Sequence, residues 1–149
     1  MQRLKGKVAV ITGGNSGIGL ALACLFAKEG AQVIITARRQ EVLDEAVRQI
    51  GHGAIGIKGD VASLEHHAEV AEQVMARFGA LDIYMANAGV ITLTPSHKVT
   101  PEEFDAQFNI NTRQTTHFEQ SQGYVIKSDF LDQGLFSYVQ ICNGRVQLI

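Results

Sequence analysis

The stretch TGGNSGIG, residues 12–19, constrains the fold more than any other part of this sequence. It directly follows VAVI, a run rich in β-branched residues that is typical of a strand buried on both faces. It leads into residues 16–29, which carry apolar residues at helical spacing and are followed by Gly30. A glycine-rich turn at a helix start offers free backbone N–H groups, and the helix dipole there favours anions. The stretch therefore predicts a strand, a turn and a helix that together bind a phosphate group.

The alternation of strand and helix continues along the chain. Strands are predicted at residues 8–12, 32–36, 54–57 and 81–86. Helices are predicted at residues 16–29, 41–50 and 64–78, and from Pro101 onward. Strands that alternate with helices imply right-handed crossovers and a parallel sheet. We therefore predict an α/β fold with an open, doubly wound parallel sheet in the strand order 3-2-1-4.

Apolar residues at helical spacing predict which face of each helix is buried. Phe104 and Phe108 of the last helix are expected to point inward, and the adjacent His66 and His67 are expected at the surface. The expected buried faces of the three earlier helices are Leu20, Ala23, Cys24 and Ala27; Val42, Leu43, Ala46, Val47 and Ile50; and Leu64, Ala68, Ala71, Met75 and Phe78.

The strand and helix pattern ends near Thr116. We therefore divide the chain into a dinucleotide-binding domain, residues 1–117, and a tail of different character, residues 118–149. The tail contains the short β-like runs YVI, LFSYVQI and RVQLI, separated by glycines. Two outcomes are open for it: strands added to the edge of the sheet, or irregular structure.

Composition excludes several classes of partner. The net charge of −2 includes no run of basic residues, so nothing predicts binding to nucleic acid or to an anionic membrane. Cys24 and Cys142 lie far apart and the histidines are scattered or adjacent, so no metal site is predicted. The chain begins without the apolar stretch of a secretion signal, which favours a cytoplasmic protein. The expected partner is a small molecule, and an oligomer stays open.

Three motifs together resemble the short-chain dehydrogenase/reductase family. They are the TGxxxGxG pattern after the first strand, Asp60-Val61 after the third strand and Asn87-Ala88-Gly89 after the fourth strand. The resemblance covers residues 3–117. It implies a Rossmann fold, a nicotinamide cofactor, and hydride transfer to or from an alcohol or carbonyl group.

The resemblance also implies which residues contact the cofactor. Asp60 matches a residue that binds the adenine amino group, although it could instead be a loop carboxylate near the third helix. Asn87 could tie neighbouring loops together, a role compatible with cofactor contact. The complete set of candidate cofactor-binding residues is Gly13, Asn15, Ser16, Gly17, Ile18, Gly19, Arg38, Arg39, Asp60, Val61, Asn87, Ala88 and Gly89.

The end of the second strand predicts which nicotinamide dinucleotide binds. A carboxylate at this point would bind the ribose 2′-OH of NAD(H), whereas arginine would bind the 2′-phosphate of NADP(H). This sequence has Ala37-Arg38-Arg39 and no acid there, so NADP(H) is favoured over NAD(H). The alternative is that both arginines only begin a solvated helix.

The catalytic residues implied by the family are incomplete. Asn111 matches an asparagine that supports a proton relay through water in the family, and it is the one catalytic candidate. The family also uses a serine, and a tyrosine with a lysine four residues later that lowers the tyrosine pKa. No tyrosine of this sequence has that lysine: Tyr84, Tyr124 and Tyr138 are followed four residues later by Ala88, Ser128 and Cys142.

Three hypotheses therefore remain open. The chain is a truncated or frame-shifted form of an NADP-dependent oxidoreductase and is itself inactive. Alternatively, it is a non-catalytic module that binds NADP(H) or another protein. The third possibility is a product that does not fold stably, because the edge of the fourth strand loses its usual cover.

Overall fold

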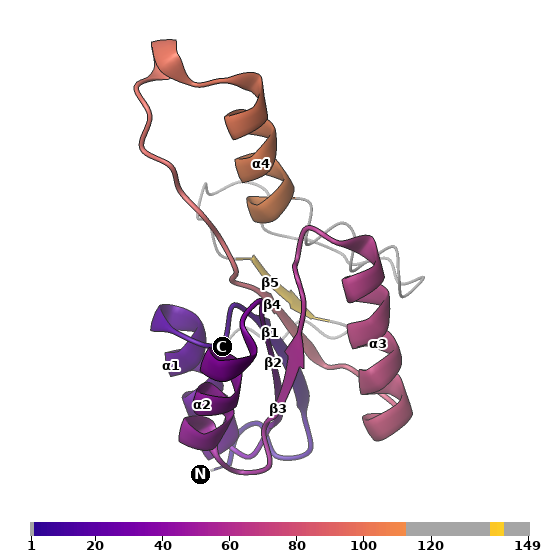
Figure 1. Cartoon of the computed structure of the whole chain (residues 1–149). Coiled ribbons are helices and arrows are strands. Elements are labelled where there is room, and N and C mark those ends of the chain that lie inside the picture. Colours follow the sequence, from indigo (N-terminus) through magenta and orange to yellow (C-terminus); the bar gives the residue numbers. More distant parts are fainter. Residues whose placement is uncertain (1, 113–137, 142–149) are drawn as a thin grey trace.

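A computed structural model of the chain describes residues 2–112 and the strand residues 138–141 (Figure 1). The alternation of strands and helices predicted from the sequence is confirmed, with element boundaries that differ by two residues or fewer. The elements are β1 (Val8–Thr12), α1 (Gly17–Lys28), β2 (Gln32–Ala37), α2 (Gln40–Ile50), β3 (Ile55–Lys58), α3 (Leu64–Phe78), β4 (Ile83–Ala86), η1 (Ser96–Lys98), α4 (Pro101–Asn111) and β5 (Tyr138–Ile141).

The strands form one sheet in the order β3-β2-β1-β4-β5. The first four are parallel, which confirms the predicted order 3-2-1-4. The fifth strand is antiparallel to β4, with Ala86 opposite Tyr138 and Ile83 opposite Ile141. One of the three β-like runs of the tail therefore adds a strand to the sheet edge. The other two runs lie outside the described residues.

The sheet is covered on both faces (Figure 1). Ala9 and Ile11 of β1 pack with α1 and α2 on one face, while Val8 and Val10 pack with α3 on the other. Because successive side chains of a strand point to opposite faces, a strand in this position must be apolar throughout. Burying each Val or Ile side chain contributes about 1.5–3 kcal/mol to folding, so the VAVI run stabilises both layers at once.

The buried face of α3 differs from the predicted one. Leu64 and Met75, which were expected to be buried, are 52% and 37% exposed. The residues that α3 buries are His66, His67, Val70, Ala71 and Val74. The helix is rotated because its two histidines pack beneath the turn that follows β3, which periodicity of apolar residues could not indicate. The expectation that His66 and His67 lie at the surface is wrong.

Helix α4 begins as predicted but is not buried as predicted. Thr100 and Glu103 form a complete capping box, and Pro101 occupies the first turn. Phe104 and Phe108, expected to point inward, are 60% and 49% exposed and stack on one another with ring centroids 5.9 Å apart. Figure 1 shows α4 standing away from the sheet, which agrees with the exposure of both residues.

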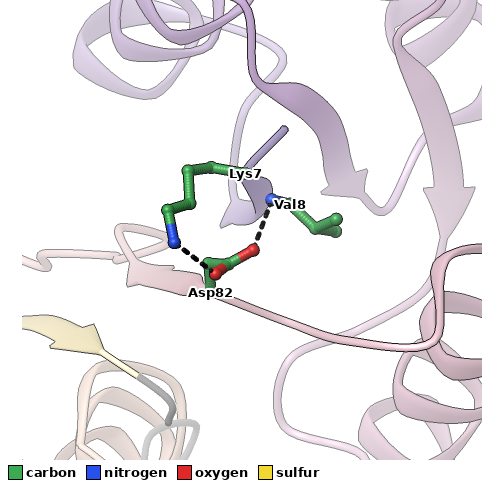
Figure 2. Close-up of polar contacts among 3 residues, drawn as sticks. All are labelled: Lys7, Val8 and Asp82. Atoms are coloured by element: carbon green, nitrogen blue, oxygen red, sulfur yellow. Dashed lines mark hydrogen bonds and ion pairs between the residues drawn. The ribbon is translucent and has the colours of Figure 1, made fainter. Parts of the chain in front are cut away.

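A carboxylate joins the amino ends of β1 and β4 (Figure 2). One oxygen of Asp82 accepts a hydrogen bond from the backbone N–H of Val8 at 2.9 Å, and the other accepts one from Lys7 Nζ at 2.9 Å. The backbone N–H of Asp82 in turn donates to the Val8 carbonyl at 3.0 Å. This contact holds the pairing of Ala9 with Ile83 at the end of the sheet opposite the cavity described below.

The Asp82 contact predicts a graded loss of stability. We expect Asp82→Ala to lower the free energy of unfolding by about 1–2 kcal/mol, because a partly buried N–H group loses its acceptor. Lys7→Met removes only the half-exposed ion pair and should cost about 0.5 kcal/mol or less. Urea denaturation of both variants tests this, and equal losses would show that the ion pair carries the effect.

Candidate functional site

A cavity of about 590 Å³ opens at the carboxyl ends of the parallel strands. Four segments that were predicted separately meet around it: the turn after β1, the end of β2, the turn after β3 and the residues after β4. The predicted site residues in its lining are Gly13, Asn15, Ser16, Arg38, Arg39, Asp60, Val61, Asn87, Ala88 and Gly89. The predicted residues Gly17, Ile18 and Gly19 form the first turn of α1 and lie outside the lining.

The glycines of the first turn meet different physical demands. Gly13 has φ +63°, and a Cβ there would lie 2.9 Å from the Cα of Ala88. A Cβ at Gly19 would lie 2.4 Å from the Gly13 carbonyl oxygen and 2.5 Å from Nδ2 of Asn87. Gly17 has φ +54° but open space around the Cβ position. Gly13 and Gly19 thus permit close packing of the turn, whereas Gly17 supplies only a left-handed backbone conformation.

A cluster of hydrogen bonds ties this turn to the end of β4. The Thr12 hydroxyl accepts from the backbone N–H groups of Asn87 and Ala88 at 3.0 and 2.9 Å, and donates to the Met85 carbonyl at 3.3 Å. The Asn87 amide donates to the carbonyls of Thr12 and Gly13 at 3.0 and 3.3 Å. Asn87 therefore has the structural role that was one of its two open alternatives, while it also lines the cavity.

The N-cap end of α1 lies at the cavity. Ser16 is the N-cap residue and lines the cavity, yet its side chain makes no capping hydrogen bond. The first N–H groups of a helix have no partner within the helix, and the dipole adds partial positive charge there. This end of the cavity is therefore suited to an anion.

The end of β2 carries positive charge into the cavity. Arg38 and Arg39 both line it and both are exposed, and Arg39 is the N-cap residue of α2. Neither forms an ion pair within the described part of the chain. Asp60 is the single acid in the lining and belongs to the turn after β3. The two guanidinium groups are thus available to an anionic ligand.

Helix α3 packs against the turn after β3 through two histidines. The N–H of Gly59 donates to the Ala37 carbonyl at 3.0 Å, and the Asp60 carboxylate accepts from the N–H of Ala62 at 2.9 Å. The ring of His67 hydrogen-bonds the Val61 carbonyl through Nε2 at 2.8 Å. The His66 ring fills the space beside Gly59, where a Cβ would come within 1.9 Å of Nδ1. Both histidines therefore support the cavity wall.

Asn111 acts on the loop after β4. Its side-chain amide donates to the Val90 carbonyl at 2.7 Å, and its Oδ1 accepts from the Val90 N–H at 2.8 Å. Asn111 itself does not line the cavity, although Val90 and Ile110 do. The structure thus places the one catalytic candidate as an anchor for a cavity-lining residue.

Several lining residues were missed by the sequence analysis. They are Thr36, Ala37, Val42, Gly59, Val90 and Ile110. Thr36 and Gly59 adjoin the ends of β2 and β3, so the rule that ligands bind beyond strand carboxyl ends could have found them. Val90 and Ile110 carry no chemical signal and become recognisable only through the position of Asn111.

Residues 2–112 and 138–141 contain neither a membrane-spanning helix nor a metal-binding cluster. This part of the chain has no helix long and apolar enough to span a membrane. It also contains no group of three or more His, Cys, Asp or Glu side chains arranged to hold a metal ion.

Sequence comparison places the same residues in a known family. A family model for short chain dehydrogenases matches residues 7–124. The chain is 47% identical over 115 residues to "Oxidoreductase asL5" of Sarocladium schorii, covering 77% of this chain and 46% of that protein. It is 42% identical over 115 residues to "Versicolorin reductase 1" of Aspergillus parasiticus, covering 74% of this chain and 44% of that protein. The chain thus spans less than half the length of these relatives.

Solved structures resemble about four fifths of the chain. The L-sorbose reductase of Gluconobacter frateurii, complexed with NADPH and L-sorbose, superposes with a TM-score of 0.76 at 35% identity. That match covers 80% of this chain and 47% of the reductase. A short chain dehydrogenase from Bacillus anthracis also gives a TM-score of 0.76 at 34% identity, covering 80% of this chain and 51% of that one.

Burial of His66 predicts a loss of stability in mild acid. Burial lowers the pKa of His66 below its ordinary value of 6.5, and the carboxylates of Asp60 and Glu69 oppose this shift. The unfolded chain therefore takes up a proton more readily, so stability falls as the pH drops below about 6.5, by up to about 1.4 kcal/mol per pH unit. His66→Gln should flatten the dependence between pH 6.5 and 5.5 in urea denaturation.

The matched control is His97→Gln, because His97 is exposed on η1. It should keep the pH dependence of the unaltered chain. An unchanged dependence in His66→Gln would contradict the assignment of this effect to His66.

Proposed function

The chain belongs to the short-chain dehydrogenase/reductase family, whose members bind a nicotinamide dinucleotide, and we propose that residues 1–117 form the NADP(H)-binding part of an oxidoreductase. The reaction would be hydride transfer between the nicotinamide and an alcohol or carbonyl group. The observation that carries this proposal is the meeting of a helix N-terminus, two arginines and the Asp60 turn around one cavity. When bound, the dinucleotide would supply the hydride.

Different residues of the cavity lining are suited to different parts of a dinucleotide. The start of α1, with Asn15 and Ser16, offers N–H donors suited to the pyrophosphate. Asp60, oriented by its hydrogen bond from Ala62, would accept from the adenine amino group, with Val61 against the ring. Ala88 and Gly89 follow β4 and would lie nearer the nicotinamide end.

The preference for NADP(H) over NAD(H) rests on Arg38 and Arg39. A 2′-phosphate carries additional negative charge, and guanidinium groups bind phosphate through charge-assisted hydrogen bonds. Lining residues 36–39 at the end of β2 include both arginines and no acid, and the one acid of the lining is Asp60 in the turn after β3. The L-sorbose reductase that resembles this chain is complexed with NADPH, which is compatible with a preference for NADP(H).

The chain is proposed to bind the cofactor without turning over a substrate. No tyrosine in the sequence has a lysine four residues later. Tyr84 is completely buried in the sheet, and burial raises its pKa, which opposes proton donation to a ligand in the cavity. Tyr124 lies outside the described residues. In a longer parent protein, Asn111 would hold the Val90 segment beside the reacting groups.

The second candidate function is a non-catalytic module that binds NADP(H) or another protein. The antiparallel pairing of β5 with β4 favours it, because β4 is then hydrogen-bonded on both sides within this chain. A sheet without an open edge at β4 is protected from unspecific pairing. If the module binds NADP(H), both candidates share the cofactor site and differ only in whether a longer parent protein adds the residues that complete a catalytic centre.

Cofactor binding by this chain is testable through Arg38. We expect NADPH to raise the melting temperature more than NADH at equal concentration, because tighter binding to the folded state stabilises it more. Arg38→Ala should weaken NADPH binding about 10- to 100-fold, since a charge-assisted phosphate contact is lost, and leave NADH binding nearly unchanged. Isothermal titration calorimetry measures both affinities.

Arg77→Ala is the matched control, because Arg77 lies exposed in the last turn of α3 and outside the cavity lining. Tighter binding of NADH than of NADPH would overturn the cofactor assignment. Oxidation of NADPH by the 149-residue chain in the presence of carbonyl compounds would overturn the absence of turnover.

A further inference from the structure

Two threonines in neighbouring strands differ in whether their hydroxyl groups are hydrogen-bonded. Thr12 of β1 and Thr36 of β2 are register partners, so their side chains point to the same face of the sheet. Both residues are almost completely buried, at 2% and 1% exposure. The Thr12 hydroxyl makes the three hydrogen bonds that join β1 to the end of β4. The Thr36 hydroxyl has no hydrogen-bond partner within the residues that the structure describes.

A buried hydroxyl without a partner needs an explanation. Such a group has lost its hydrogen bonds to water without replacing them, which costs free energy. Valine has the same shape as threonine, favours strands equally and would avoid this cost. Buried polar groups in native proteins are nearly always satisfied, so the missing partner of Thr36 points to a group that arrives from outside the chain.

The position of Thr36 indicates where such a group would lie. Thr36 lines the cavity, whereas Thr12 does not. It directly precedes Ala37 and Arg38, and the N–H of Gly59 is bound to the Ala37 carbonyl beside it. Thr36 therefore lies between the arginines and the Asp60 turn, the part of the cavity assigned above to adenosine.

We propose that the Thr36 hydroxyl is a ligand-binding group that hydrogen-bonds the adenosine end of the dinucleotide. This inference rests on the proposed function, since it specifies a contact within the same cavity. A hydroxyl both donates and accepts, so it fits a ring nitrogen or a ribose oxygen equally. Thr36 thereby contributes to affinity without contributing to the stability of the unliganded chain.

The two threonines provide a matched pair of variants. Thr36→Val should leave the melting temperature of the unliganded chain unchanged or raise it, because only an unpartnered hydroxyl is removed. Thr12→Val should lower it, because three hydrogen bonds are lost. Thermal unfolding without ligand measures this difference.

Calorimetric titration with NADPH and with 2′,5′-ADP, which carries only the adenosine end, tests the contact itself. Thr36→Val should weaken both by the same factor, on the order of 5- to 20-fold for one hydrogen bond. Thr36→Ser, which keeps the hydroxyl, should restore most of the affinity for both compounds.

The inference is overturned if Thr36→Val binds both compounds as the unaltered chain does, or loses affinity for NADPH alone. It is also overturned if Thr36→Val lowers the melting temperature as much as Thr12→Val, since the hydroxyl would then have a partner inside the protein. If the unaltered chain binds neither compound, the proposed function fails first, and the inference fails with it.

Discussion

The hydrogen bonds of Thr12 hold together the two segments between which the cavity opens. From β1 the chain passes to β2 on one side of the sheet, while β4 lies on the other side. The strand order therefore reverses between β1 and β4, and open α/β sheets bind ligands at the carboxyl ends of the strands at such a point. One hydroxyl bonds three backbone groups of β4 and the residues after it, and Asn87 returns two hydrogen bonds to the turn after β1.

The glycines of the first turn make this junction possible. With a Cβ, Gly13 would collide with Ala88 and Gly19 would collide with both Gly13 and Asn87. At Gly13 and Gly19, the absence of a side chain therefore allows the turn after β1 to pack closely against the residues after β4. At Gly17 there is no such neighbour, and the need is for the backbone conformation that opens α1 toward the cavity. The glycine-rich turn therefore both packs against the residues after β4 and leads into the N-terminus of α1, whose N–H groups can donate hydrogen bonds.

Much of the fold could be predicted because local signals agreed with the tertiary structure. Val8–Thr12 is apolar throughout since both faces of β1 are covered, and the Thr100 capping box is wholly local. Prediction failed where contacts outside an element determine which of its residues are buried. The histidines of α3 are buried because Gly59 leaves room for the His66 ring, and Phe104 is exposed because no described element covers α4. The antiparallel direction of β5 likewise depends on its pairing with β4.

The candidate site likewise contains some residues that could be predicted from the sequence and others that could not. Residues in motifs, such as Asp60 and Asn87, were found from the resemblance to the family, and the structure brings them to one cavity. Thr36 was missed because a threonine at the end of a strand is ordinary, and only the lack of a hydrogen-bond partner distinguishes it. Asn111 was found, yet its two hydrogen bonds to Val90 could not be inferred from the sequence.

The central claim is that these 149 residues contain a preformed dinucleotide site. The most direct test is an NMR titration that follows backbone amide signals while NADPH is added. We expect saturable changes at one equivalent, largest at Gly13, Arg38, Asp60 and Gly89, and none at Phe104 on the distant α4. Unchanged spectra, or changes confined to the exposed rings of α4, would contradict the account.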